Sequence, residues 1–256
     1  MRGKEVSVLC KVSVLVPVYN VKQYLRQCLD SLVAQTLDDI EFVCIDDGST
    51  DGSEKILDEY AERDARFRII HKVNSGYGAS MNVGLRAARG EYIGIVESDD
   101  FADAEMFATL YDMAKAQDAD VVRSNFWEVT DADLTFHEEL AGHPYEEVFC
   151  PMEQDPKLLL TLPTIWSAIY RKSFLFQNDI WFHETPGASF QDLSFSFMVI
   201  SSAQRYFLVR EAYLHYRIDN AGSSVHSKGK VFCVSDEYDY MDLNYSTRLI
   251  PDGIAS

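Results

Sequence analysis

One short stretch near the middle of the chain constrains the fold more than any other. Residues 92–96 read YIGIV, an apolar run typical of a buried strand, and they stop abruptly at Glu97, Asp99 and Asp100. Side chains alternate along a strand, so Glu97 and Asp99 are expected on one face, with Asp100 where the strand breaks. Such a concentration of carboxylates is costly unless they are solvated or share a cation. Oxygen ligands suit Mg²⁺ or Mn²⁺, although an acidic surface turn explains the stretch alone equally well.

Two earlier apolar runs end in the same way, and helical patterns separate them. Residues 11–19 end at Asn20, and residues 41–45 end at Asp46 and Asp47. Strands that alternate with helices predict an α/β fold, with a Rossmann-like, mostly parallel central sheet flanked by helices. Ligands bind outside the carboxyl ends of strands in such sheets. We therefore expect these polar strand ends to converge on one crevice.

Local signals predict further boundaries. Asn20 is expected to cap a helix with Gln23 as its capping-box partner, and Asp51 with Glu54 to cap the next one. Residues 131–157 are predicted as loop, 164–176 as helix, 191–200 as helix, and 206–209 and 212–216 as short strands. Residues 219–230 are expected to form a mobile polar segment, and 232–245 a helix without an obvious cap or core contribution.

Composition excludes several classes of partner. The chain has 256 residues and a formal net charge of −18, so a nucleic-acid partner is not expected. Its five cysteines are scattered and include no C-x-x-C spacing, which predicts neither a zinc site nor a disulfide framework. No apolar run reaches 18 residues, and the apolar stretch in residues 1–10 is too short for a signal peptide. These observations favour a soluble protein of a reducing compartment.

Four motifs appear in the order and spacing of family 2 glycosyltransferases, which the chain resembles. They are VPVYN at 16–20, IDDGSTDGS at 45–53, the glycine-containing segment 74–84, and ESDD at 97–100. Residues 191–195 and 216–224 are also similar to that family, so the resemblance covers roughly residues 11–226. It implies a GT-A fold with a smaller acceptor-binding part, a nucleotide-sugar donor, a divalent metal and inversion at the anomeric carbon.

The resemblance also implies roles for single residues. Asp99 is the expected ligand of Mg²⁺ or Mn²⁺, and Asp192 matches the general base; Arg217 with Ser223 and Ser224 resembles a segment that closes on the diphosphate. The expected donor-binding residues are Pro17, Tyr19, Asn20, Asp46, Asp47, Gly76, Gly78, Asn82, Glu97, Ser98 and Arg217.

Three positions depart from the family pattern. Glu97 replaces the usual Asp, Gln191 replaces a Glu often found before the base, and Met81 stands where Arg is common. The change at 81 removes a cation from the expected donor loop. The change at 97 adds a methylene that could shift the geometry of the ribose or the metal.

Each site residue also has an ordinary structural interpretation. Asp46 and Asp47 could form a capped turn, Asp192 could be a helix N-cap, and Arg217 could be a surface ion pair. The Gly76-x-Gly78 pattern does not fit a dinucleotide fingerprint, because Met81 fills the third glycine position. Four aromatic residues could stack on acceptor sugars, although core packing is the stronger expectation. They are Trp166, Tyr170, Trp181 and Phe182.

The resemblance divides the chain into four parts. Residues 1–10 are an N-terminal extension, 11–130 a nucleotide-sugar-binding subdomain, 131–226 an acceptor-binding and catalytic subdomain, and 227–256 a C-terminal segment consistent with a truncated chain.

The predicted function is metal-dependent, inverting transfer of a sugar to a hydroxyl of a glycan or lipid-linked saccharide. A UDP-sugar is the expected donor, and the expected place is the cytoplasm, with peripheral association at the inner face of the plasma membrane. A non-catalytic nucleotide-sugar-binding protein remains an alternative. A nucleotidyltransferase is a weaker one, since residues 16–20 supply no basic glycine-rich signature.

Overall fold

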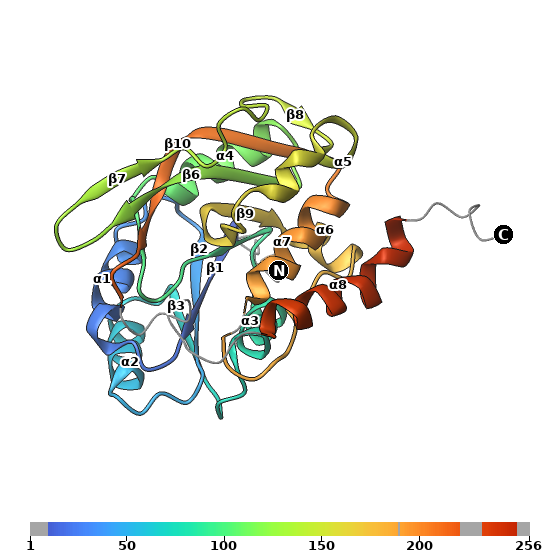
Figure 1. Cartoon of the computed structure of the whole chain (residues 1–256). Helices are drawn as coiled ribbons and strands as arrows, with labels where there is room; N and C mark the ends of the chain where they lie inside the picture. The colour runs from blue at the N-terminus through green and yellow to red at the C-terminus, as the bar shows by residue number, and fades with distance from the viewer. Residues whose placement is uncertain (1–9, 189, 221–231, 250–256) are drawn as a thin grey trace, which may run out of the picture.

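The computed structural model describes residues 10–188, 190–220 and 232–249. One sheet runs through this part of the chain in the order β3-β2-β1-β4-β9-β6-β10-β5, with β7 paired to β6 and β8 to β10 (Figure 1). The strands are β1 (Val12–Val18), β2 (Ile40–Asp46), β3 (Phe67–His71), β4 (Tyr92–Ile95), β5 (Phe101–Ala102), β6 (Val121–Val129), β7 (Leu134–His137), β8 (Val148–Phe149), β9 (Ala168–Arg171) and β10 (Tyr206–Arg217).

The half of the sheet formed by β3, β2, β1 and β4 is parallel, and its strands other than the edge strand β3 are buried. Every residue of β1, β2 and β4 is buried, which explains their nearly continuous apolar sequences. Val18 pairs with Asp46, and Leu15 pairs with Ile95. The carboxyl ends of β1, β2 and β4 therefore meet at one edge, as the α/β prediction required.

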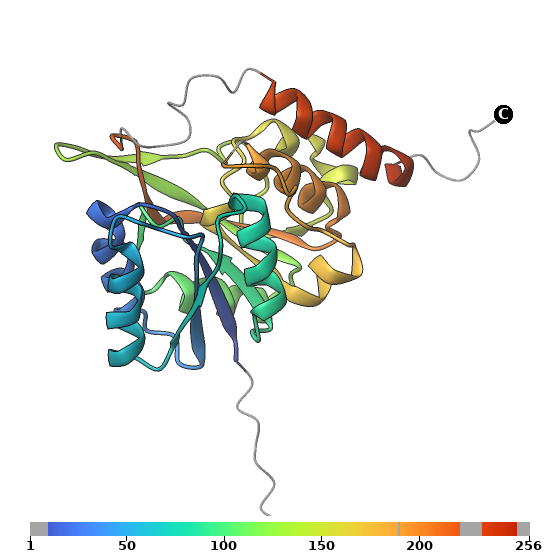
Figure 2. The same cartoon turned by 90° about the horizontal axis from the view of Figure 1, so that it is seen from below.

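Helices cover both faces of this half. They are α1 (Lys22–Val33), α2 (Ser53–Arg63), α3 (Tyr77–Ala87) and α4 (Met106–Ala116). Figure 2 shows α1 and α2 side by side on one side of the strands and α3 on the other. The predicted α/β class, with helices around a central sheet, is confirmed.

The prediction of loop over 131–157 is wrong. Strand β7 pairs with β6, β8 pairs with β10, and a short helix α5 (Pro151–Gln154) follows. Strand β7 is largely exposed, so it lacks the alternation of buried and exposed residues that marks a strand in a sequence.

The prediction of one helix over 164–176 is also wrong. A 3-10 turn (Pro156–Leu160) precedes this region. The region itself contains a second 3-10 turn (Ile165–Ser167), then β9, and then α6 (Lys172–Gln177). Strand β9 lies between β4 and β6 and is antiparallel to both. Helical turns on each side of a four-residue strand produced the misleading helical spacing.

The C-terminal part of the sheet and its helices are closer to expectation. Helix α7 (Gln191–Ser202) is confirmed, whereas the two predicted short strands are one strand, β10, with irregular pairing between Val209 and Leu214. Helix α8 (Cys233–Leu249) packs on α7 and buries Glu237 and Met241, so it does contribute to the core. Most of the predicted mobile segment lies outside the described residues. Within the described residues, no helix combines the length and apolarity needed to span a bilayer.

The caps of α1 and α2 also differ from the prediction. Asn20 adopts a left-handed backbone (φ 51°), and its side chain accepts a hydrogen bond from Thr50 N at 2.8 Å rather than capping α1. Instead, Asp51 accepts one from Lys22 N at 2.9 Å and another from Ser53 N at 2.9 Å. Asp51 thus serves the first turns of both helices, which fixes α1 and α2 to the turn that follows β2.

Candidate active site

The chain turns sharply after β4, and three carboxylates lie at that turn. Glu97 accepts a hydrogen bond from the Tyr77 hydroxyl at 2.6 Å. Burial, together with the charges of Asp99 and Asp192, raises the pKa of Glu97 to about 8, against the hydrogen bond from Tyr77, which lowers it. The β4 turn and the distant Asp192 therefore share one electrostatic environment.

Asp100 and Asp99 differ in their surroundings. Asp100 is buried; its Oδ1 accepts a hydrogen bond from Arg217 N at 2.8 Å, and its Oδ2 has no partner among the described residues. Burial, followed by the charge of Asp99, raises the pKa of Asp100 well above its usual range. Asp99 is half-buried, and its Oδ2 accepts a hydrogen bond from Asn220 at 2.7 Å.

The carboxylate oxygens at this turn fit a divalent metal whose other ligands are mainly the phosphates of a bound substrate. No cluster of three or more His, Cys, Asp or Glu side chains suited to a metal occurs among the described residues. Mg²⁺ commonly binds one or two protein carboxylates and completes its shell with water and substrate phosphates. Asp99, a half-buried carboxylate beside the unpartnered Asp100 oxygen, suits that arrangement.

Asp192 lies in the first turn of α7. The N-cap of α7 is Phe190 with a left-handed backbone (φ 65°), so the alternative that Asp192 is the N-cap is wrong. Asp192 Oδ1 accepts a hydrogen bond from Leu193 N at 3.1 Å. Burial, together with the charge of Glu237, raises the pKa of Asp192 to about 6, against the backbone hydrogen bonds, which lower it. A carboxylate of this kind can accept a proton near neutral pH.

Tyr216 of β10 is influenced both by the carboxylates of the β4 turn and by Asp192. The sequence analysis predicted no role for this residue. Burial raises the pKa of Tyr216 to about 12, and the charges of Asp100, Asp99, Asp192 and Glu97 contribute in that order. The charges of all four carboxylates therefore act on one phenol. Its position next to Arg217, at the start of a motif, was the available sequence signal.

Several aromatic residues fill the core below Tyr216. The Tyr216 ring stacks on Trp166, with centroids 4.9 Å apart. Trp166, Tyr170 and Phe182 are all buried, as expected for core packing. Trp181 is half-buried beneath the Arg86 guanidinium, 4.8 Å from its ring centroid.

The carboxylates after β2 order the loops at the sheet edge. Asp47 accepts hydrogen bonds from Ser75 N and Gly76 N, both at 2.9 Å, and pairs with Lys72. Asp46 accepts one from Ser49 N at 2.9 Å and lies 2.8 Å from His71 Nδ1. The link from Asp47 to Gly76 places this loop next to Tyr77, and hence next to Glu97.

Gly76 and Gly78 pack against the segment 182–187, rather than facing open space. A Cβ at Gly76 would lie 2.9 Å from Gly187 N, and one at Gly78 would lie 2.8 Å from the His183 carbonyl carbon. Asn82 strengthens this contact: it donates to Phe182 O and to Glu184 Oε1, both at 2.9 Å, and accepts from Phe182 N at 3.0 Å. The contacts of Gly76, Gly78 and Asn82 with a nucleotide sugar stay predictions. In this structure the three residues contact the loop before α7.

The remaining predicted residues lie around the same edge. Pro17 and Ser98 are buried, while Tyr19 is exposed at the end of β1. The buried Arg217 donates to Gln27 at 2.8 Å and to the Asp99 carbonyl at 3.3 Å, and it lies over the Tyr24 ring. Ser223 and Ser224 lie outside the described residues.

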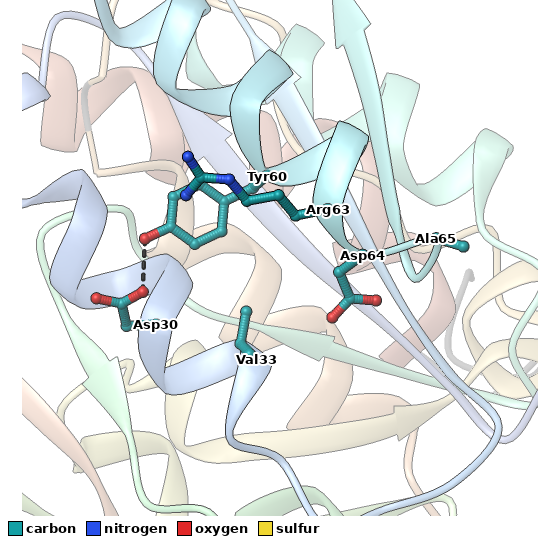
Figure 3. Close-up of a pocket in the computed structure, with 6 residues that line it drawn as sticks. All are labelled: Asp30, Val33, Tyr60, Arg63, Asp64 and Ala65. Carbon is teal, nitrogen blue, oxygen red and sulfur yellow. Dashed lines mark hydrogen bonds between the residues drawn. The ribbon is translucent and has the colours of Figure 1, made fainter.

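A surface hollow lies at the other edge of the sheet. Figure 3 shows it between α1 and α2, where the Tyr60 hydroxyl donates a hydrogen bond to Asp30. The volume of the hollow is about 440 Å³. Its lining comes from the C-terminal halves of both helices and from Asp64 and Ala65, which follow α2. A helix that follows a parallel strand returns to the amino edge, so this hollow is remote from the carboxylates.

Comparisons with known proteins agree with this architecture. The model of the family described as "Glycosyl transferase family 2" matches residues 13–181. The glycosyltransferase EpsJ of Bacillus subtilis is 32% identical over 228 residues, which are 80% of this chain and 60% of EpsJ. The chain thus spans about 60% of the length of that relative.

Solved structures of glycosyltransferases have the same fold. S. aureus TarS 1–349 in complex with UDP-GlcNAc superposes with a TM-score of 0.76 and 25% identity, over 91% of this chain and 65% of that one. The mannosyltransferase PcManGT from Pyrobaculum calidifontis, in complex with GDP-Man and Mn²⁺, has a TM-score of 0.60 and 17% identity, over 83% of this chain and 58% of that one. The second likeness concerns the fold alone. On the family match and the architecture together, this chain belongs to glycosyl transferase family 2.

Proposed function

We propose that the chain transfers a sugar from a nucleotide sugar, with a UDP-sugar as donor, to a hydroxyl of a glycan or lipid-linked acceptor. The observation that carries the proposal is that Tyr77 links the turn after β4 to the loop before α7. Its hydroxyl donates to Glu97 at 2.6 Å and its amide to Gly187 O at 2.9 Å, and the charges of Glu97, Asp99 and Asp192 all act on Tyr216. These carboxylates come from two segments that lie far apart in the sequence, yet they influence the same phenol. The TarS complex with UDP-GlcNAc supports the choice of donor class.

Asp99 would hold a divalent metal, Mg²⁺ or Mn²⁺, together with the donor diphosphate. Such a metal stabilises the negative charge of the leaving diphosphate, an effect of several kcal/mol. The Mn²⁺ complex of PcManGT is consistent with this fold using a divalent metal. Because Met81, buried in the core, supplies no cation, a metal held by Asp99 would supply positive charge for the diphosphate that this position does not.

Asp192 would act as the general base. Its carboxylate removes the proton of the acceptor hydroxyl while that oxygen bonds to the anomeric carbon and the bond to the β-phosphate oxygen breaks. A single displacement of this kind inverts the anomeric configuration and needs no second carboxylate as nucleophile. General-base assistance typically contributes about 10²–10⁴-fold to such a step.

The donor residues and the subdomain division belong to the same proposal. Residues 11–130 would bind the nucleotide sugar, and 131–226 would supply the base and the acceptor surface. The acceptor would be a growing surface polysaccharide, met at the inner face of the plasma membrane. Its saccharide would approach from the side of α7, where Asp192 lies.

The test is turnover of nucleotide sugars. The protein is incubated with UDP-, GDP- or dTDP-sugars, Mn²⁺ or Mg²⁺, and a panel of saccharide acceptors, and nucleoside diphosphate release is measured. We expect metal-dependent release with a UDP-sugar. Asp99→Ala should abolish metal-dependent UDP binding in calorimetry. Donor binding by the wild type without turnover on any acceptor would favour the non-catalytic alternative.

A further inference from the structure

Helix α8 places a buried carboxylate behind the candidate base. Glu237 is only 1% exposed, although it belongs to the C-terminal helix (red in Figure 1). Its Oε1 lies 3.0 Å from His183 Nδ1, and its Oε2 accepts a hydrogen bond from the Ser194 hydroxyl. A buried carboxylate is costly unless its oxygens are satisfied, and here both oxygens are.

The two partners of Glu237 lie on either side of Asp192 in the sequence. His183 belongs to the segment 182–187 that packs on α3, and Ser194 lies in the first turn of α7, two residues after Asp192. The His183 ring also stacks on Tyr240, one turn further along α8, with centroids 4.1 Å apart and planes at 9°. Helix α8 therefore contacts both the segment 182–187 and the first turn of α7.

The segment 182–187 is attached to α3 and to α7 by further hydrogen bonds. Tyr77 N donates to Gly187 O at 2.9 Å, and the buried Gln191 donates to Thr185 Oγ1 at 2.7 Å. These contacts connect the loop that carries Gly76 to the start of α7. Glu237 adds a contact from α8 to each of these two parts, through His183 in the segment 182–187 and Ser194 in α7. No other described carboxylate contacts both His183 and Ser194.

We propose that Glu237 is a positioning residue for the transfer reaction, fixing segment 182–187 and the first turn of α7 relative to each other so that Asp192 faces the acceptor hydroxyl. This inference rests on the proposed function. Glu237 touches neither substrate nor metal in this scheme; it acts through His183 and Ser194.

The charge of Glu237 gives this role a measurable signature. It is among the groups that raise the pKa of Asp192, while Asp192 in turn contributes to the raised pKa values of Glu97, Tyr77 and Tyr216. These groups come from α8, the β4 turn, α3 and β10. A neutral residue at 237 removes one negative charge near Asp192 and leaves the other groups in place.

The experiment compares two substitutions at 237 with a matched control on the same helix. Glu237→Ala removes both contacts. Glu237→Gln keeps the shape and removes the charge. Asp239→Asn removes one charge from an exposed position of α8. For each variant of the 256-residue chain, steady-state transfer from a UDP-sugar is measured from pH 5 to 8. Thermal unfolding and hydrogen exchange of peptides covering residues 182–195 are measured as well.

We expect Glu237→Ala to lower kcat by about tenfold or more, since a misplaced catalytic group can cost about 10²-fold. The donor KM should change much less, and exchange should rise in residues 182–195. Glu237→Gln should shift the acid limb of the kcat profile to lower pH, and Asp239→Asn should match the wild type in every readout.

Failure of this inference is distinct from failure of the proposed function. Active wild-type enzyme with Glu237→Ala and Glu237→Gln indistinguishable from it would overturn the positioning role alone. The positioning role is also overturned if Glu237→Ala loses stability but keeps its kcat and the wild-type exchange of residues 182–195. If the wild type transfers from no donor, both proposals fall together.

Discussion

Replacing Gly78 with alanine tests the contact between α3 and the loop before α7. Within a helix, Gly→Ala normally stabilises by roughly 1 kcal/mol through backbone entropy. Here the new methyl group meets the backbone of His183. Ordinary contact begins near 3.4 Å, so the His183 carbonyl carbon, 2.8 Å from the ideal Cβ, must retreat by about 0.6 Å and its oxygen by more.

The backbone at His183 cannot yield freely, because Asn82 holds both sides of it and Glu237 holds its ring. Overpacking against a fixed neighbour typically costs about 1–3 kcal/mol. After the helix gain is subtracted, the free energy of unfolding should fall by about 1 kcal/mol, or roughly 3 °C in Tm for a domain of this size. Transfer should fall by more than about tenfold, since the displaced loop leads into Asp192.

Gly84→Ala in the same helix is the matched control. Its Cβ would meet the ends of the Ile45 and Leu15 side chains, at 2.9 and 3.2 Å, and these can adjust. The stabilisation of the helix by alanine is the same as at Gly78, but the loop before α7 is not displaced. Gly84→Ala should therefore retain transfer. Thermal unfolding and UDP-sugar turnover measure both effects. Wild-type turnover in Gly78→Ala, or equal losses in both variants, would refute the proposed contact.

The other predictions concern charge. Asp192→Asn should keep UDP binding in calorimetry and lose about 10²–10⁴-fold in transfer; full activity would exclude Asp192 as the base. Since a base must be deprotonated and the pKa of Asp192 is about 6, kcat should fall about tenfold per pH unit below pH 6, and a flat profile between pH 5 and 7 would contradict this. The hydrogen bond to Asp46 raises the pKa of His71. That contribution to stability is complete below the unfolded pKa and disappears as pH rises through the folded one, so urea unfolding at pH 5.5 and 8.5 should separate wild type from His71→Gln only at the lower pH.

The sequence predicted the parallel half of the sheet because its strands are buried on both faces. Continuous apolar runs in β1, β2 and β4 leave little doubt about strand identity, and the polar residues at their ends follow from topology. The position of Asp192 at the start of a helix was equally readable. These features depend on local pattern and on one general rule of α/β sheets.

The remaining features depend on contacts between distant residues. Nothing near Gly78 in the sequence indicates that His183 packs on it, and nothing near Glu237 indicates a buried partner on α7. Strand β9 has four residues, too few to display a period of its own. Asp51 illustrates the same limit: it was expected to cap one helix, and it serves two because β1 and β2 end side by side.

Strand β9 also has a consequence for how the chain must assemble. It is the only described bridge between β4 and β6, so the residues that precede it contain two sets of strands, β3-β2-β1-β4 and β6-β7, that do not pair directly. During synthesis each set presents an open hydrogen-bonding edge until residues 168–171 emerge and insert between them. Unpaired edges of this kind attract other strands. A chain stopped before β9 should therefore aggregate, while one that extends through it joins the two sets of strands before α7, with Asp192, and β10 are added.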